Sequence, residues 1–285
     1  MSATDDPQVN LSSTRALMHR AVAEGAQFVL TPEMTNAMSS DRIHLARVFR
    51  TENEDPTLPA LQDEAARAGI WLLIGSLGLL ADDDDTPTRP PGRDGGPRFV
   101  NRSFLVDASG AVVARYDKIH MFDVDLSETD SFRESAAYRP GDRAIVARTP
   151  IGAIGLSVCY DVRFPSLYRA LAQAGATIVT VPSAFSHVTG PPHWEVLLRA
   201  RAIETGSWVL APAQTGRHAA QGGRPRRSHG HSLVVAPWGE VVADGGIAPG
   251  IVLADVDLRA VSEARRRVPS LMHDRSFALP DGAVS

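Results

Sequence analysis

The chain has 285 residues, of which 44% are hydrophobic and 22% are charged, and its formal net charge at pH 7 is -4. A chain of this length can bury roughly three quarters of its extended surface, so it can form a large core without disulfides. The 29 basic and 33 acidic residues argue against a nucleic acid as partner, because phosphate binding needs an excess of basic residues. The longest apolar runs, such as 70–74, are far shorter than the roughly 20 residues of a membrane-spanning helix.

Cys159 is the single cysteine of the chain, so it can form neither an internal disulfide nor a cysteine-based zinc site. It can be a packing residue, an intermolecular link or a nucleophile. The first ten residues are polar and acidic and lack the features of a secretory signal, so we expect a cytoplasmic protein. No cluster of histidine and cysteine suggests a metal, and we expect no cofactor.

Helical and strand patterns alternate from the N-terminus onward, which indicates an α/β fold. In the first part of the chain the pattern predicts a helix over Leu11–Glu24 capped by Asn10, a strand over Gln27–Leu30, a helix over Thr57–Gly69 and a strand over Ile70–Leu77. In the middle it predicts a hairpin of Phe99–Val106 and Ala111–Tyr116, a strand over Ile151–Val158 and a helix from Phe164-Pro165 to Ala174. The rest is predicted as a strand over Thr177–Val181, a helix over His193–Glu204, strands over Trp208–Ala211 and Gly250–Asp257, and a final arginine-rich helix.

Two stretches are predicted to be surface loops within one domain that covers residues 1–285, because strand patterns resume on both sides of each. Residues 81–98 contain four consecutive aspartates and several prolines, and residues 216–228 contain basic residues among glycines. The basic side chains of the second loop are Arg217, His218, Arg224, Arg226 and Arg227. Arginines in such loops usually face solvent, but loops also carry function, so a substrate contact by one of them stays open.

Cys159 ends a predicted strand, where active-site residues of α/β folds collect. A thiol acts as a nucleophile when a base removes its proton and positive charge stabilises the product. By residue type, four histidines could be that base, namely His120, His187, His193 and His231. Alternatively the base is a carboxylate with a nearby lysine, and Glu33 and Lys118 each follow a predicted strand.

Three separated motifs together resemble one family. Glu33 in T-P-E-M, Lys118 in Y-D-K-I-H-M-F-D and Cys159 in S-V-C-Y-D-V-R-F-P resemble the Glu–Lys–Cys triad of the nitrilase superfamily of carbon–nitrogen hydrolases. Glu134, in R-E-S, resembles the second glutamate that lies near the lysine. The resemblance runs to about Arg275, and it implies a four-layer αββα sandwich that pairs into homodimers or higher homo-oligomers.

The resemblance also implies a mechanism. Glu33 takes the Cys159 proton, the thiolate attacks an amide carbonyl, and Lys118 with the backbone N–H of Tyr160 holds the oxyanion. Ammonia then leaves, and Glu33 activates the water that hydrolyses the thioester. Glu134 would position Lys118 and keep it charged.

Substrate recognition is expected to involve Arg163, which resembles the arginine that relatives use to hold a substrate carboxylate. The alternative for Arg163 is a salt bridge with a neighbour such as Asp161. Phe185, Thr189 and His193 fall where family members line the pocket.

Further motifs in residues 182–204, 213–218 and 230–241 resemble the amidases that hydrolyse deaminated glutathione. The alternative is an ω-amidase acting on α-ketoglutaramate or another small ω-amide, and both substrates carry a carboxylate. One departure favours a different class: the first strand of the family has no counterpart before Met1–Asn10. If that loss disrupts the region of Glu33, the chain would be a weakly active or inactive relative that acts as a binding protein.

Overall fold

The computed structural model describes residues 1–81, 98–126, 131–219 and 226–278. Most of the first predicted loop (82–97) and the centre of the second (220–225) lie outside these ranges. Within them, no helix has the length and apolar character needed to cross a membrane.

The first sheet has four strands in the order β1-β2-β3-β4. These strands are β1 (Phe28–Leu30), β2 (Trp71–Leu80), β3 (Phe99–Val106) and β4 (Val112–Asp117). β1 and β2 are parallel, and β2, β3 and β4 follow as antiparallel neighbours. Helices α1 (Pro7–Ala23) and α3 (Thr57–Ala68) cover its outer face, with side chains such as Leu61, Leu72 and Phe104 packed between them.

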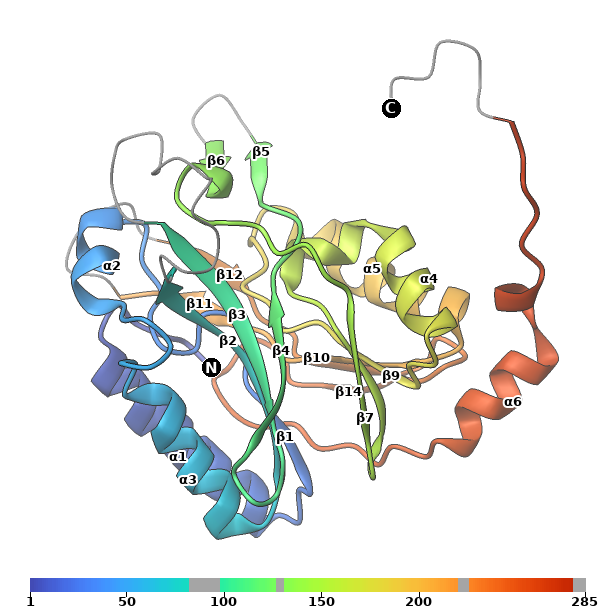
Figure 1. The fold of residues 1–285 in the computed structure, drawn as a ribbon, viewed down its shortest axis with the longest axis horizontal. Coiled ribbons are helices and arrows are strands. Elements are labelled where there is room, and N and C mark those ends of the chain that lie inside the picture. Colours follow the sequence, from blue (N-terminus) through green and yellow to red (C-terminus); the bar gives the residue numbers. More distant parts are fainter. Residues whose placement is uncertain (82–97, 127–130, 220–225, 279–285) are drawn as a thin grey trace.

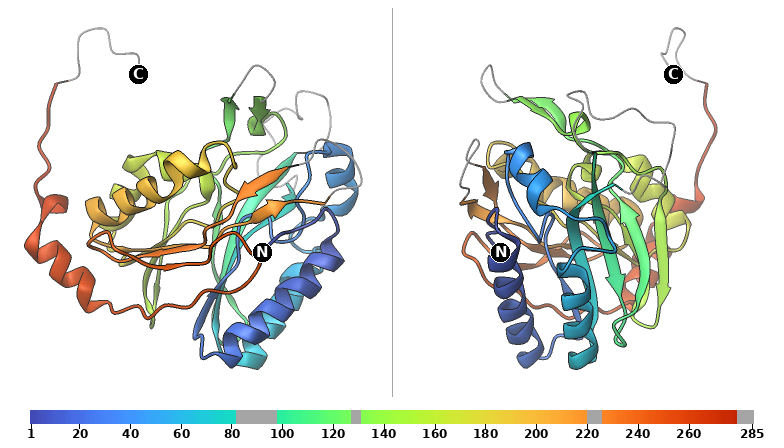
Figure 2. Two further views of the ribbon diagram at one scale, coloured as in Figure 1. Left: turned by 180° about the vertical axis from the view of Figure 1, so that it is seen from behind. Right: turned by 60° about the vertical axis from the view of Figure 1, so that its left-hand side comes forward.

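The second sheet has six strands in the order β14-β13-β10-β9-β8-β7. These strands are β7 (Ile145–Thr149), β8 (Gly152–Leu156), β9 (Ile178–Thr180), β10 (Trp208–Ala211), β13 (Leu233–Val235) and β14 (Val241–Asp244). Helices α4 (Pro165–Gln173) and α5 (Gly190–Thr205) cover the face turned away from the first sheet (Figure 1). Leu73 and Leu105 of the first sheet share a core with Ile154 and Val209 of the second. The two sheets therefore pack face to face between two helical layers (Figure 2), which confirms the predicted four-layer αββα sandwich.

The remaining elements lie around this sandwich. They are α2 (Arg42–Val48), the ribbon of β5 (Asp123–Asp125) and β6 (Ser131–Arg133), the short helices η2 (Glu134–Ala136) and η3 (Cys159–Arg163), the ribbon of β11 (Thr215–Arg217) and β12 (Arg227–His229), α6 (Arg259–Arg267) and η4 (Ser270–Met272). Helix α6 is held by Arg265, whose guanidinium donates to the carbonyl oxygens of Thr205 and Ala176.

The first predicted helix exists, but its predicted cap is wrong. Helix α1 begins at Pro7, and the Asp6 carboxylate caps it by accepting from the N–H groups of Gln8 and Val9. Asn10 lies inside the helix, where its buried side chain bonds the carbonyl oxygens of Thr4 and Asn36. Proline at the first helical position is a start signal of its own, because its missing N–H would have no partner there.

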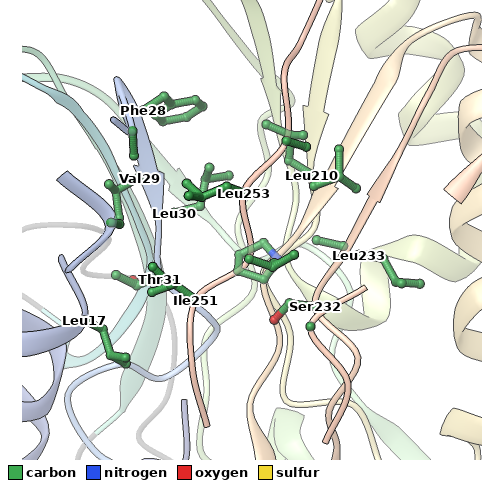
Figure 3. A pocket seen from close by; sticks show the side chains of 18 of the residues that line it. Leu17, Phe28, Val29, Leu30, Thr31, Leu210, Ser232, Leu233, Ile251 and Leu253 are labelled. Atoms are coloured by element: carbon green, nitrogen blue, oxygen red, sulfur yellow. The ribbon is translucent and has the colours of Figure 1, made fainter. Parts of the chain in front are cut away.

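A cleft of about 780 Å³ separates β1 from part of the second sheet. Figure 3 shows Phe28, Val29 and Leu30 of β1 on one wall, Leu210 and Leu233 on the other, and Ile251 and Leu253 between them. The strand predicted over Gly250–Asp257 is wrong, because this segment pairs with no described strand. β1 is accordingly the edge of its sheet.

Candidate active site

Three strands end at the same place and bring the predicted residues together. Glu33 follows β1 after Thr31-Pro32, Lys118 directly follows β4, and Cys159 begins η3 just after β8. Each of the three residues is buried, with relative exposures of 4%, 2% and 8% respectively. Charged side chains are rarely buried to this degree unless they are paired, so Glu33 and Lys118 each need an oppositely charged partner within the cluster.

Cys159 adopts a strained backbone conformation. Its φ is +50°, a left-handed value that is uncommon outside glycine, and its N–H donates to the carbonyl oxygen of Pro182 at 2.9 Å. Strain of this kind persists only when the surrounding structure holds it, and it concentrates at functional sites. The Tyr160 N–H, next in the chain, donates to no acceptor in the described part of the structure.

Lys118 lies between two carboxylates. Its Nζ donates to Glu33 Oε1 at 3.0 Å and to the two carboxylate oxygens of Glu134 at 2.9 and 2.8 Å. Glu134 is held in turn by the Phe122 N–H, which donates to its Oε2 at 2.6 Å. The cluster thus contains one cation and two anions that are largely buried.

Glu33 has two further donors that the sequence did not reveal. Asn101 Nδ2 donates to its Oε1 at 2.9 Å, and the Ala184 N–H donates to its Oε2 at 2.8 Å. Gln214 Nε2 binds the Glu33 carbonyl oxygen at 3.1 Å. Asn101 could have been singled out in the sequence as a polar residue within a largely apolar predicted strand, because a buried amide needs a hydrogen-bond partner.

The charges of the cluster shift the pKa values of all three residues. Burial raises the pKa of Glu33, but the charge of Lys118 and hydrogen bonds from Cys159, Lys118 and Ala184 outweigh it, so the pKa lies below its ordinary value. Burial lowers the pKa of Lys118, and the two glutamates more than reverse this. Burial and the Glu33 charge raise the pKa of the Cys159 thiol well above its ordinary value. The resting state is therefore a thiol hydrogen-bonded to a carboxylate, beside an ammonium group.

Asp161 joins the Cys159 turn to the segment that carries Lys118. Its fully buried carboxylate accepts from the Val158 N–H at 2.8 Å and from the Tyr116 hydroxyl at 2.7 Å through Oδ2. Its Oδ1 accepts from the His120 N–H at 3.0 Å and lies 2.7 Å from His120 Nδ1. A carboxylate with four such partners fixes the distance between the two segments. The alternative expected for Arg163, a salt bridge with Asp161, is not found in the described residues, where Arg163 lies beside His193.

A pocket of about 320 Å³ opens onto Glu33, Lys118 and Cys159. Of the predicted substrate residues, Phe185 and Thr189 line it, and the buried Thr189 hydroxyl has no hydrogen-bond partner within the described ranges. Arg163 and His193 are not among its lining residues. They lie beside each other, with Arg163 Nη2 3.2 Å from His193 Nδ1 and the Arg163 guanidinium 5.4 Å from the centre of the Phe185 ring.

The histidines considered as bases have other neighbours. His120 contacts Asp161 and stacks on Phe164, His193 contacts Arg163, and His231 contacts Asp244. His187 lines the pocket. The group hydrogen-bonded to the thiol is the Glu33 carboxylate, which favours the carboxylate alternative.

Comparison with known proteins agrees with this geometry. The model of the carbon–nitrogen hydrolase family matches residues 2–266. The chain is 40% identical over 279 residues to the deaminated glutathione amidase of Homo sapiens, which covers 96% of this chain and 80% of that protein. It is 39% identical over 256 residues to the enzyme of the same name from Yersinia enterocolitica, covering 88% of this chain and 82% of that protein.

Solved structures show the same fold. The C. elegans NitFhit protein superimposes with a TM-score of 0.83 at 33% identity, over 96% of this chain, which spans 63% of that longer chain. Saccharomyces cerevisiae Nit3, a nitrilase-superfamily member, gives 0.81 at 27% identity, with 97% and 93% of the two chains covered. An amidase from Nesterenkonia sp. AN1 with acrylamide added to its active-site cysteine gives 0.71 at 28% identity, with 94% and 95% covered. The chain belongs to the carbon–nitrogen hydrolase family, within the nitrilase superfamily.

Proposed function

We propose that the chain is an amidase in which Cys159 is the nucleophile and Glu33 the general base. The observation that carries this proposal is the buried cluster in which the thiol, two carboxylates and an ammonium group meet at one pocket. Glu33 takes the thiol proton as sulfur attacks the amide carbon, and it then gives that proton to the leaving amine. In the second step Glu33 takes a proton from water as the water oxygen attacks the thioester carbon, and it returns that proton to the Cys159 sulfur as the C–S bond breaks, which restores the thiol and the carboxylate.

Lys118 and the backbone N–H of Tyr160 would bind the oxyanion of each tetrahedral intermediate. The Lys118 charge is present throughout, since its pKa is raised, and the Tyr160 N–H has no other acceptor in the described structure. Preorganised donors of this kind each lower the activation barrier by a few kcal/mol. Glu134 holds Lys118 through two hydrogen bonds, so its proposed role is to position the ammonium group.

For the substrate we propose deaminated glutathione, because the relatives at 39–40% identity carry the name of that amidase. Deaminated glutathione contains secondary amides, so its cleavage releases an amine, whereas the sequence analysis expected ammonia. A primary amide such as α-ketoglutaramate, the alternative substrate, does release ammonia. The product therefore distinguishes the two substrates.

The direct test supplies each substrate to the purified chain and measures the free 2-oxo acid, the released amine and ammonia separately. We expect kcat/KM for deaminated glutathione to exceed that for α-ketoglutaramate by at least about tenfold, with amine in place of ammonia as product. A preference for α-ketoglutaramate would assign the chain to the ω-amidases. If the chain hydrolyses neither amide, the choice of substrate class is wrong.

The pKa shifts predict a one-sided pH dependence. Glu33 must be ionised, and its pKa lies below the ordinary value, so kcat/KM falls only as the pH drops through that lowered pKa. The thiol pKa is raised, and so is that of Lys118, so neither group titrates near neutrality. We expect kcat/KM to stay level between about pH 6 and about pH 9. A rise in rate near the ordinary cysteine pKa of about 8.5 would instead indicate that a free thiolate is the reactive form.

We also propose that the chain forms a single domain, acts as a homodimer or higher homo-oligomer and resides in the cytoplasm. The family match over residues 2–266 supports the first statement. The other two follow from the sequence features and the resemblance given above.

A further inference from the structure

The pocket beside Cys159 is lined by more positive than negative side chains. Among its described lining residues the cations are Lys118, Arg42, Arg133, Arg226 and Arg227, and the anions are Glu33 and Glu134. The two glutamates already pair with Lys118, so the arginines supply the excess positive charge of the pocket. A pocket of this charge suits an anionic substrate.

Arg226 is half-buried, whereas Arg227 beside it is exposed, and within the described residues no ion pair of Arg226 is found. Arg133 Nη2 donates to both carboxylate oxygens of Asp125 at 2.8 Å, and Arg42 donates to the Arg133 carbonyl oxygen at 3.2 Å. In residues 1–81, 98–126, 131–219 and 226–278, no carboxylate pairs with the half-buried Arg226. A partly desolvated guanidinium without an anion is unfavourable, and its five donors are suited to a bidentate carboxylate.

The backbone fixes Arg226 on the pocket wall. Its carbonyl oxygen accepts from the His218 N–H at 3.0 Å, where the chain enters the β11-β12 ribbon. The next residues join the ribbon to the pocket wall, because the His187 N–H donates to the Arg227 carbonyl oxygen at 3.4 Å and Ser186 forms a β-bridge with Ser228.

The positive charge of Arg226 acts on a side chain that lines the pocket, Tyr138. Burial raises the pKa of Tyr138, a lining residue, and Arg226 opposes this, as does Lys118, while Glu134 and Glu33 add to it. Arg226 therefore acts on the same side chain as the catalytic cluster does.

We propose that Arg226 binds a carboxylate of the substrate. This inference rests on the proposed amidase function and adds to it the residue that selects acidic amides. Deaminated glutathione has carboxylates at both ends, and the chemistry of recognition is the same for each. The variants and substrates below separate the two ends.

The test uses the full chain as wild type, Arg226→Gln, Arg226→Lys and the control Arg217→Gln. Arg217 lies in the same ribbon, is exposed and does not line the pocket. We expect Arg226→Gln to raise KM for deaminated glutathione about 10- to 100-fold with kcat nearly unchanged, and Arg226→Lys to recover part of that loss. Arg217→Gln should leave KM within about twofold of wild type.

Two modified substrates identify the carboxylate. Replacing the glycine carboxylate of deaminated glutathione by a carboxamide should remove the effect of Arg226→Gln if Arg226 binds that end. If it binds the 2-oxo acid end, the effect persists with the carboxamide and also appears with α-ketoglutaramate. An unchanged KM for every acidic substrate overturns the inference.

A binding experiment separates this inference from the proposed function. Calorimetry with Cys159→Ser and with Cys159→Ser/Arg226→Gln measures the affinity for deaminated glutathione without turnover. Weaker binding by the double variant supports the carboxylate contact even where the wild type fails to cleave the substrate, which would overturn the proposed function alone. Equal affinity of the two variants overturns the contact.

Discussion

Cys159→Ser is expected to lower kcat for amide hydrolysis by at least about 10³-fold, because a serine hydroxyl is far less acidic than a thiol and the base of this site activates it poorly for attack on the amide carbon. The Glu33 carboxylate has a lowered pKa, so it is a weak base that can assist a thiol far better than an alcohol. A loss of 10³ corresponds to about 4 kcal/mol of transition-state stabilisation. The measurement is steady-state release of the 2-oxo acid.

The single cysteine makes the control simple. Intact-mass analysis after treatment with an electrophile should show one adduct per wild-type chain and none on Cys159→Ser. Because serine is nearly isosteric, the melting temperature should change by no more than a few degrees. Steady-state turnover by Cys159→Ser close to the wild-type rate would exclude the thioester mechanism.

Glu33→Gln is expected to lower kcat/KM by at least about 10³-fold while Cys159 stays available for labelling. The amide cannot accept the thiol proton. In the wild type, one carboxylate oxygen of Glu33 accepts from Asn101 and Lys118, and the other accepts from the Ala184 N–H. The glutamine amide keeps one acceptor oxygen and replaces the other by an NH₂ donor. One of these donors then loses its acceptor, which costs about 1–3 kcal/mol of folding free energy.

The matched control for Glu33→Gln is Glu195→Gln. Glu195 lies on the exposed face of α5, where its carboxylate pairs with Arg199 at 3.3 Å and its side chain is 57% exposed. This variant should keep kcat/KM within about twofold of wild type. Thermal unfolding of Glu33→Gln and its labelling to one adduct per chain show whether the fold and the thiol survive. If they do and kcat/KM falls less than tenfold, Glu33 is not the base.

Local patterns predicted the α/β class and placed Glu33, Lys118 and Cys159 at strand ends, whereas the four-layer sandwich and the triad were predicted from the family resemblance. Apolar runs ending at Glu33, before Lys118 and before Cys159 predict strands, and the carboxyl ends of strands gather at one edge. The triad that the resemblance implies then forms if these three strand ends lie close together. The same local signals predicted α3 and α4 to within a residue or two at most ends.

Contacts between segments distant in the chain could not be predicted in this way. Asp161 was considered only as a partner of its neighbour Arg163, whereas its carboxylate bonds Tyr116 and His120, more than forty residues earlier. Arg226 was one of several arginines in a loop, and only the folded ribbon shows that it lines the pocket. The strand over Gly250–Asp257 failed for the same reason, because an extended segment becomes a strand only when a partner lies beside it.

Because β1 is the edge strand of its sheet, its mobility affects the position of Glu33, which follows it in the chain. Thr31 N–H donates to the Leu73 carbonyl oxygen and Trp71 N–H to the Gln27 carbonyl oxygen, so the backbone groups between them alternate toward and away from β2. Those of Phe28 and Leu30 point toward the cleft. Their amide hydrogens should exchange with deuterated solvent at rates typical of a surface segment, although β1 lies in an inner layer. Because β1 leads directly to Glu33, local opening of this strand would displace the catalytic base before the rest of the sandwich unfolds.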